Sequence, residues 1–473
     1  MRHLFMKSFL IGIAVTGLTM SSWAQNKIQL DLKTSLEIAF QKNSQLKIAR
    51  AELDQAEAQL GQARTAFFPK LTSQANYTRL DYAPFIPLKS FGSIFPGGGM
   101  PGGLPGGATP KKITIGRNEN YGLSISLQQP IFAGFKISNS YSIAKHNKKA
   151  AEQKYKKAKE DLIFSVEQAY WNLVKAHKFD EIARESIKQM RAHMRDLQNM
   201  YDVGMLTKNE VLKAQVQLSN VQLMEIKAKN AVKLAQTAFC NVVGLPLDTE
   251  ILPNEPLKMI PLPVENVKQA IQLAKANRPD LKMIQENVII GKKMVNINRG
   301  SYLPTVALVA NYGYKYPDRE YNPDFYATWT VSMVAQMTLF DWGETYYKKA
   351  QSEYQLAQIK NTQKMVQDGA TLDVTQSFLQ TIEAREKIQA SEKTVAQAKE
   401  NFRVTNDKFK EGMATNTDFL DANALLTQAK NDYVSALADY RISVAKLLKA
   451  IGTIESETAN LSETSSNTNP SDF

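Results

Sequence analysis

The sequence of 473 residues contains few of the side chains from which catalytic and metal sites are built: one cysteine, Cys240, and four histidines. A single cysteine cannot form an intramolecular disulfide, and on its helical apolar stripe Cys240 is most simply a small core residue. No H-E-x-x-H or C-x-x-C spacing, nucleophile elbow or phosphate loop is present. We therefore expect no enzyme, no cofactor and no bound metal.

Long hydrophobic runs are also scarce. Arg2 and Lys7 mark a basic start, residues 8–20 form an apolar run, and Ser22-Trp23-Ala24 resembles a cleavage signal, so residues 1–24 are predicted to be a secretory signal peptide. A membrane anchor is the alternative, which the shortness of the run disfavours. No later stretch reaches about 18 apolar residues, so any membrane crossing by the mature chain would have to be made by strands.

The formal net charge of +12 is compatible with a nucleic acid or an anionic membrane as partner. Lysine and glutamate nevertheless alternate along the predicted helices, which is typical of solvated faces. The densest basic stretch, Lys145 to Lys157, is better explained as a helix surface than as a specific anion site. No nucleic acid partner is expected.

The most informative property is an internal repeat. A shift of 235 residues aligns Pro69 with Pro304, and a shift of 208 residues aligns Gly204 with Gly412. The two shifts differ by 27 residues, which we assign to a Pro- and Gly-rich hairpin loop at 84–110. We predict a first repeat over 25–250, a second over 251–455 and a disordered tail over 456–473.

Each repeat has the same predicted order of elements. A helix comes first, at 32–66 and at 264–299, with Gly61, Pro279 and Gly291 as weak points. Two strands follow, and the second of each pair alternates apolar and polar residues with period two. Two long helices complete the repeat. The first of them, at 135–203, has neither glycine nor proline and carries apolar residues at the three–four spacing of a coiled coil.

Four strands of about ten residues are long enough to cross a bilayer but too few to close a barrel, since the smallest barrels use about eight. If the strands span, the subunit must oligomerise; two copies give eight strands, three give twelve with an open lumen, and the alternation does not choose between them. Four aromatic residues lie at the strand ends, as an interfacial belt requires: Phe132, Phe135, Phe340 and Trp342. A soluble sandwich with core aromatics is the alternative.

Several segments together resemble one family. They are Gln129-Pro130-Ile131-Phe132-Ala133-Gly134, Ala169-Tyr170-Trp171, Arg278-Pro279-Asp280-Leu281 and the segments that begin at Tyr201 and Gly412. Over about residues 30–452, the sequence resembles the TolC-like outer membrane efflux protein family. The resemblance implies a mainly α fold with a β-barrel part: a trimeric 12-stranded outer-membrane β-barrel plus a long α-helical periplasmic tunnel.

The same resemblance implies function and partners. The homotrimer would sit in outer membrane lipid and passively conduct drugs, small toxic compounds or secreted polypeptides. It would dock to a periplasmic adaptor (membrane fusion) protein and an inner-membrane efflux pump or ABC exporter, as in multidrug efflux and type I secretion. The competing interpretation is a soluble periplasmic coiled-coil adaptor, which would lack the amphipathic strands.

Two short turns join the long helices and are predicted to form the periplasmic tip. In each, a glycine stands where a helix ends and a threonine where the next helix can be capped. By resemblance the turns also dock the adaptor. The predicted docking residues are Val203, Gly204, Met205, Leu206, Thr207, Gly412, Met413 and Thr415.

Asp418 and Asp421 follow the second turn, and their i, i+3 spacing places both carboxylates on one helix face. Alone they are ordinary helix-start acids. By resemblance they match an aspartate pair that rings the constricted entrance, a gate that favours cations. The family's Tyr–Arg latch is matched here by Phe409 and Ala414, which cannot form it. The corresponding first-repeat residues are Glu210 and Lys213, so the acid pair is not duplicated.

Overall fold

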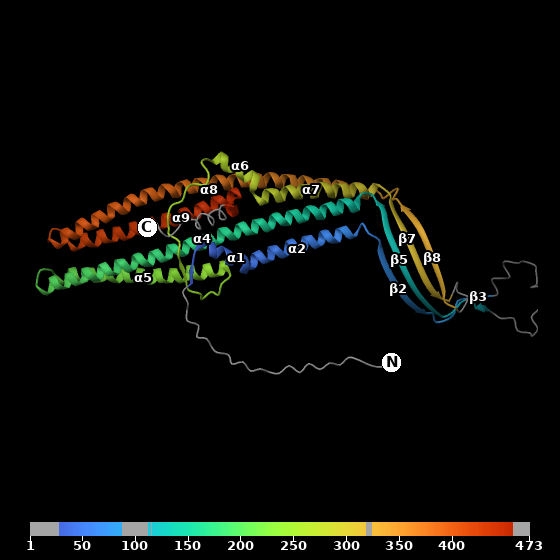
Figure 1. Cartoon of the computed structure of the whole chain (residues 1–473), viewed down its shortest axis with the longest axis horizontal. Helices are drawn as coiled ribbons and strands as arrows, with labels where there is room; N and C mark the ends of the chain where they lie inside the picture. The colour runs from blue at the N-terminus through green and yellow to red at the C-terminus, as the bar shows by residue number, and fades with distance from the viewer. Residues whose placement is uncertain (1–27, 88–111, 115, 318–323, 457–473) are drawn as a thin grey trace, which may run out of the picture.

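The computed structural model describes residues 28–87, 112–114, 116–317 and 324–456. The predicted signal peptide, most of the 84–110 loop and the tail from residue 457 lie outside the described residues. Figure 1 shows an elongated molecule in which long helices run side by side and a strongly curved sheet extends from one end. No helix within the described residues is both long and apolar enough to cross a membrane.

The main elements form two similar series. The first series is α1 (Leu32–Lys42), α2 (Ser44–Thr65), β2 (Lys70–Arg79), β5 (Glu119–Ala133), α4 (Lys136–Asp202) and α5 (Lys208–Val243). The second is α6 (Val267–Asn277), α7 (Pro279–Arg299), β7 (Thr305–Tyr316), β8 (Tyr326–Gln336), α8 (Glu344–Lys410) and α9 (Asn416–Ile451). The short elements are β1 (Ile28–Leu30), β3 (Phe85–Pro87), β4 (Lys112–Thr114), β6 (Ile251–Pro253) and the 3-10 turn η1 (Gly300–Tyr302).

The predicted long helices are present. Helices α4 and α8 each contain 67 residues, and α5 and α9 each contain 36. At 1.5 Å per residue, α4 and α8 each extend for about 100 Å. The part of α4 nearer the sheet packs on α2 and α7, and the part nearer the turns packs on α5 and α9 (Figure 1). The seam toward α5 buries Ala183, Ile187, Met190 and Leu197, at the spacing expected for a coiled coil.

The first helix of each half is broken, which corrects the prediction of single helices at 32–66 and 264–299. Asn43 interrupts the first: its side chain accepts from Leu46 N at 3.1 Å and donates to Val242 O at 2.9 Å. The second breaks at Arg278, because Pro279 has no N–H and begins α7. Pro279 was therefore a true weak point, whereas Gly61 and Gly291 lie inside helices.

The four predicted strands form one antiparallel sheet in the order β2-β5-β7-β8. The apolar side chains of β5 and β8 are exposed: Leu123 is 49% exposed, Trp329 75% and Met333 68%. The alternating polar residues of β5, such as Ser124 and Ser126, are more covered than their apolar neighbours. A soluble sandwich buries its apolar face in a second layer, and within the described residues nothing packs on this one.

The sheet meets the helices through two tight junctions. Gly134 and Phe135 lead into α4 with positive φ angles of 59° and 61°, and Trp342 and Gly343 lead into α8 with φ of 55° and 85°. Left-handed backbone is costly for an aromatic residue. At the first junction, a Cβ added to Gly134 would lie 2.3 Å from the carbonyl oxygen of Gly300, so only glycine permits this approach.

A core at mid-length ties the two halves together. Parallel strands β1 and β6 pair there, and neither was predicted from the sequence. Tyr170 is fully buried, donates to Leu30 O at 3.2 Å and accepts from Glu255 N at 3.1 Å. Cys240 is fully buried in the same cluster, as its apolar stripe predicted.

Candidate functional site

The two turns between long helices lie at the same end of the molecule, opposite the sheet (Figure 1). Gly204 has φ of 79° and donates to Tyr201 O at 2.9 Å, and Gly412 has φ of 73° and donates to Phe409 O at 3.1 Å. The next residue in each turn donates five residues back, which is the Schellman arrangement. A Cβ on either glycine would meet nothing within 4 Å, so the positive φ alone accounts for both.

The turns expose apolar side chains to solvent. Val203 is 71% exposed, Met205 73% and Met413 66%. Large apolar residues at the end of a coiled coil contribute nothing to its seam, and they form a surface suited to a partner.

The two threonines behave differently. Thr415 caps α9: its backbone N and its Oγ1 donate to Asp418 Oδ2 at 2.8 and 2.6 Å, and its side chain accepts from Asp418 N. This is a full capping box. Thr207 occupies the same position before α5 but forms no side-chain cap bond, so the predicted cap is wrong at Thr207.

Both candidate gate acids are exposed in the single chain. The pKa of the Asp418 carboxyl is held below its usual value by the side-chain and backbone bonds from Thr415. The side chain of Asp421 forms no hydrogen bond or ion pair with any described residue. Asp418 is thus a helix-start acid by its contacts, whereas no described residue pairs with the side chain of Asp421 one turn further along.

Phe409 and Ala414 form an apolar contact where a polar latch would stand. Phe409 is only 7% exposed and packs with Leu197, Ala214 and Ala414 just above the turns. The sequence-based expectation that these two side chains cannot form a Tyr–Arg latch agrees with their surroundings.

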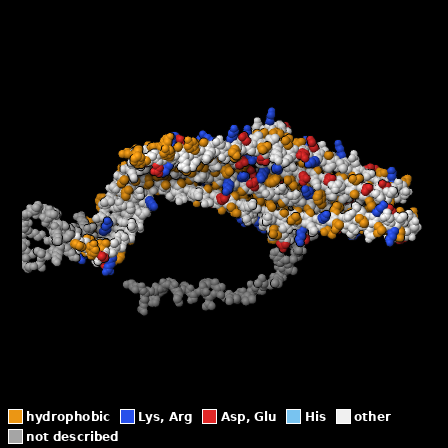
Figure 2. Space-filling model, turned by 180° about the vertical axis from the view of Figure 1, so that it is seen from behind, with side chains coloured by type: hydrophobic (Ala, Val, Ile, Leu, Met, Phe, Trp, Pro, Cys, Tyr) orange, Lys and Arg blue, Asp and Glu red, His pale blue; other side chains and the backbone are white. Residues whose placement is uncertain are grey.

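The four candidate belt aromatics lie together in pairs at the helix-side end of the sheet. The rings of Phe132 and Phe135 are 5.3 Å apart, and those of Phe340 and Trp342 are 4.9 Å apart. Phe340 is 71% exposed and Trp342 88%. Figure 2 shows apolar side chains gathered at this junction, while charged side chains are spread along the helices.

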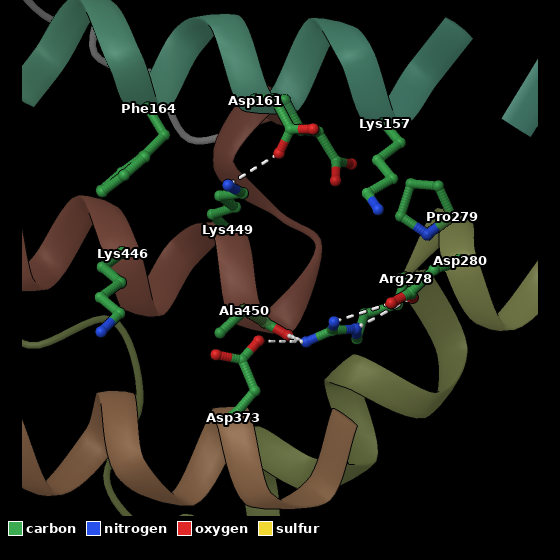
Figure 3. Close-up of a pocket in the computed structure, with 11 residues that line it drawn as sticks. Lys157, Asp161, Phe164, Arg278, Pro279, Asp280, Asp373, Lys446, Lys449 and Ala450 are labelled. Carbon is green, nitrogen blue, oxygen red and sulfur yellow. Dashed lines mark hydrogen bonds and ion pairs between the residues drawn. The ribbon is translucent and has the colours of Figure 1, made fainter. Parts of the chain in front are cut away.

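The Arg278-Pro279-Asp280 motif is a structural junction at mid-length. Arg278 donates to both carboxylate oxygens of Asp280, to Asp373 on α8 at 2.7 Å and to Ala450 O on α9 at 3.0 Å (Figure 3). These bonds anchor the break between α6 and α7 to helices α8 and α9. Nearby on α4, burial raises the pKa of the Glu160 carboxyl to about 7.

Comparison with known proteins identifies the family. The sequence profile of the family described as outer membrane efflux protein matches residues 36–245 and 270–453. The chain belongs to the outer membrane efflux protein family. It is thus a bacterial outer membrane channel protein that extends into the periplasm, of the class that exports drugs or secreted proteins, and its relatives are channels rather than enzymes. This excludes the soluble adaptor.

Individual relatives support the same family assignment. The alkaline protease secretion protein AprF of Pseudomonas aeruginosa is 25% identical, over 71% of this chain and 70% of its own. The outer membrane efflux protein BepC of Brucella suis is 22% identical, over 91% of this chain and 87% of its own. Among solved structures, the Campylobacter jejuni CmeC outer membrane channel superposes with a TM-score of 0.75 at 20% identity, over 93% of this chain and 90% of that one. This likeness establishes the channel-tunnel fold.

One group near the turns was missed at the level of sequence. His193, Asn416 and Glu210 are brought together from α4, α9 and α5. The sequence position of His193 could have indicated this group. His193 stands between the seam residues Met190 and Leu197, and a polar residue within a coiled-coil seam is unusual. Its partners could not be read from spacing, since they come from other helices.

Proposed function

We propose that three copies of the chain close a 12-stranded barrel in the outer membrane and continue as a helical tunnel into the periplasm. The observation that carries this proposal is the open four-stranded sheet with an exposed apolar face. Strands β2 and β8 are its edges, and an edge in lipid would leave backbone groups unpaired. Three copies provide twelve strands and an open lumen, whereas two provide eight and a filled one.

The barrel would be bounded on the periplasmic side by the aromatic pairs Phe132–Phe135 and Phe340–Trp342. Their exposure and their place at the sheet–helix junction suit the interfacial level of a bilayer. The opposite end of the sheet, where β2 ends and β5 begins, would then lie on the extracellular side. The duplication of the chain, with repeats at 25–250 and 251–455, supplies the pseudo-symmetry of such a ring.

The entrance of the tunnel would be formed by the second turn. Asp418 and Asp421 of three copies would bring six carboxylates together, a field that attracts cations and allows divalent ions to block the pore. Support comes from the exposure of both side chains and from the missing partner of Asp421 among the described residues.

The turns would also dock a periplasmic adaptor protein, through which an inner-membrane efflux pump or ABC exporter delivers its cargo. Val203, Met205 and Met413 supply exposed apolar anchors, and Leu206 lies beside them. The pump selects the cargo, and the conduit passes drugs, small toxic compounds or secreted polypeptides without choosing among them.

Assembly is tested by detergent extraction and planar-bilayer recording of the full mature chain. The expected result is a membrane-bound, heat-sensitive trimer that forms ion-conducting pores. A soluble monomer without pore activity would refute the channel.

The gate is tested with Asp418→Asn/Asp421→Asn. Loss of the carboxylates should raise the Mg²⁺ concentration for half-block by about tenfold or more, equivalent to roughly 1.4 kcal/mol of binding. Glu411→Gln is the matched control, because it removes one exposed acid from the same turn outside the pair. Unchanged block in the double variant would remove the carboxylate ring from the mechanism.

Docking is tested with Met205→Asp/Met413→Asp, which places charge on the apolar tip. We expect normal conductance in bilayers but loss of export in a cell that depends on this chain. Met259→Asp, on the exposed segment between β6 and α6, is the control. Full export by the double variant would show that the tip is not the docking surface.

A further inference from the structure

A buried polar link joins the two hairpins just above the turns. His193 of α4 is 3% exposed, and its Nε2 lies 2.8 Å from Oδ1 of Asn416, the first residue of α9. Asn416 is also 3% exposed. A buried polar contact between elements so distant in sequence holds them in one arrangement, because separating them leaves both groups unsatisfied.

The link continues to a third helix. The amide nitrogen of Asn416 donates to the backbone oxygen of Glu210 at 3.1 Å and to its carboxylate at 3.0 Å. Glu210 in turn pairs with Lys213 at 3.0 Å. Since the amide nitrogen is used as a donor, the amide oxygen must accept, and the network assigns the proton to Nε2 of a neutral His193.

The surroundings of the imidazole are apolar on both sides. Its ring stacks on that of Phe419, with the ring centroids 3.7 Å apart and an interplanar angle of 13°. It packs against the Phe409 ring in a T-shaped arrangement, with the centroids 4.9 Å apart. Of the packed elements, α4 contributes the charge of Asp196, and α5 contributes the Glu210–Lys213 pair. From α8 and α9, the ring is contacted by Phe409, Phe419 and the neutral Asn416, and no charged residue of these two described helices shifts its pKa.

We propose that His193 is a positioning residue for the entrance: through Asn416 and Glu210 it holds the start of α9 against the α4–α5 hairpin, and its protonation loosens that hold. The inference rests on the proposed function, because α9 carries the gate acids two and five residues beyond Asn416. A second proton would go to Nδ1 and place a charge on a ring that is only 3% exposed to water. Phe409 and Ala414 cannot supply a polar latch, so this link takes that place.

The direction of the pH effect follows from burial. Desolvation lowers the pKa of the His193 imidazole below its ordinary 6.5, so the arrangement in which the link is formed favours the neutral form. Opening exposes the ring and restores the ordinary value. Protonation therefore favours the opened arrangement, and the hold is complete above pH 6.5 and weakens as the pH falls below it.

The test is the conductance of the full mature chain in planar bilayers at pH 7.5 and 5.5. Wild type should conduct at least about threefold more at pH 5.5, within the tenfold per pH unit that one linked proton permits. His193→Gln keeps a donor for Asn416 but cannot titrate, so its conductance should stay near the wild-type value of pH 7.5 at both pH values. Asn416→Ala should conduct more at both.

His177→Gln is the matched control, because His177 is a second, partly buried histidine of α4, and burial also lowers the pKa of its imidazole. It should keep the wild-type pH response. A pH response that survives in His193→Gln, or a closed-state conductance unchanged in Asn416→Ala, overturns the inference. Wild-type trimers that form no pores refute the proposed function itself, which is a separate outcome.

Hydrogen exchange gives a second measurement that does not depend on conductance. After correction for the intrinsic pH effect, amides of residues 412–422 in the wild-type trimer should exchange faster at pH 5.5 than at 7.5, and those in His193→Gln should not. Equal acceleration in both proteins would count against a role for His193.

Discussion

The two turns at the end of the molecule opposite the sheet share a backbone conformation and differ in chemistry. Gly204 and Gly412 have nearly the same φ, and the same pair of C-terminal hydrogen bonds closes α4 and α8. After the first turn, Glu210 pairs with Lys213 and its charge is neutralised. After the second turn, the corresponding residues are two aspartates.

The difference shows that duplication preserved the shape of the hairpins while each turn acquired its own task. Shape depends on glycine at one position and apolar residues at the seam, and both halves kept them. Charge is free to differ on an exposed helix start. The first turn uses Glu210 to hold Asn416 of the second, and the second turn carries two exposed carboxylates, of which Asp418 caps α9.

The largest expected contrast is between Phe409 and Tyr201, which correspond in the two halves. Phe409 is 7% exposed and Tyr201 39%. Phe409→Ala should lower the free energy of local opening by about 3 kcal/mol, and Tyr201→Ala by less than about 1 kcal/mol. Hydrogen exchange of the two tip peptides measures both, and equal losses would contradict the asymmetry.

The glycines should behave alike. Gly204→Ala and Gly412→Ala each force a Cβ into left-handed backbone, at a cost of roughly 1 kcal/mol, and neither adds a clash. The same exchange experiment should find the two losses within experimental error of each other. A clearly larger loss at Gly412 would mean that the second turn is strained in a way its backbone does not reveal.

Substitution of the two threonines should affect the two turns differently. Thr415→Ala removes a capping box and should destabilise the start of α9 by about 1 kcal/mol. Thr207→Ala removes no cap bond and should be close to neutral at α5. Protection of the first-turn amides of each helix reports the result, and a loss at α5 as large as that at α9 would be unexpected.

The smallest expected effect is the acid titration of Asp418. Its pKa is lower in the folded protein than the ordinary 3.8, so its ionised form stabilises α9 above that pH, and the contribution disappears as the pH falls through the folded value. The difference in α9 protection between wild type and Asp418→Asn should vanish at acidic pH. A difference that persists in strong acid would point to the neutral hydrogen bond instead.

Much of the fold could be predicted from sequence because it follows from local periodicity. The run without glycine or proline gives α4 within a residue at each end, and period-two alternation locates β5 and β8. The break at Pro279 was readable from the sequence, whereas the break at Asn43 is reinforced by a bond to Val242 O of another helix, which no local pattern reveals. Asn43-Ser44 was nevertheless a readable capping signal.

The sequence by itself determined the family, the paired helices, the strands and the places of the turns, since each depends on spacing along one segment. Only the tertiary structure decided which side chains meet across segments. It left the Asp421 side chain without a partner among the described residues, joined Glu210 of α5 to Asn416 of α9, and buried His193 against Asn416 from the opposite half of the chain. Such contacts depend on how helices pack side by side, and no periodicity within one helix encodes its neighbour.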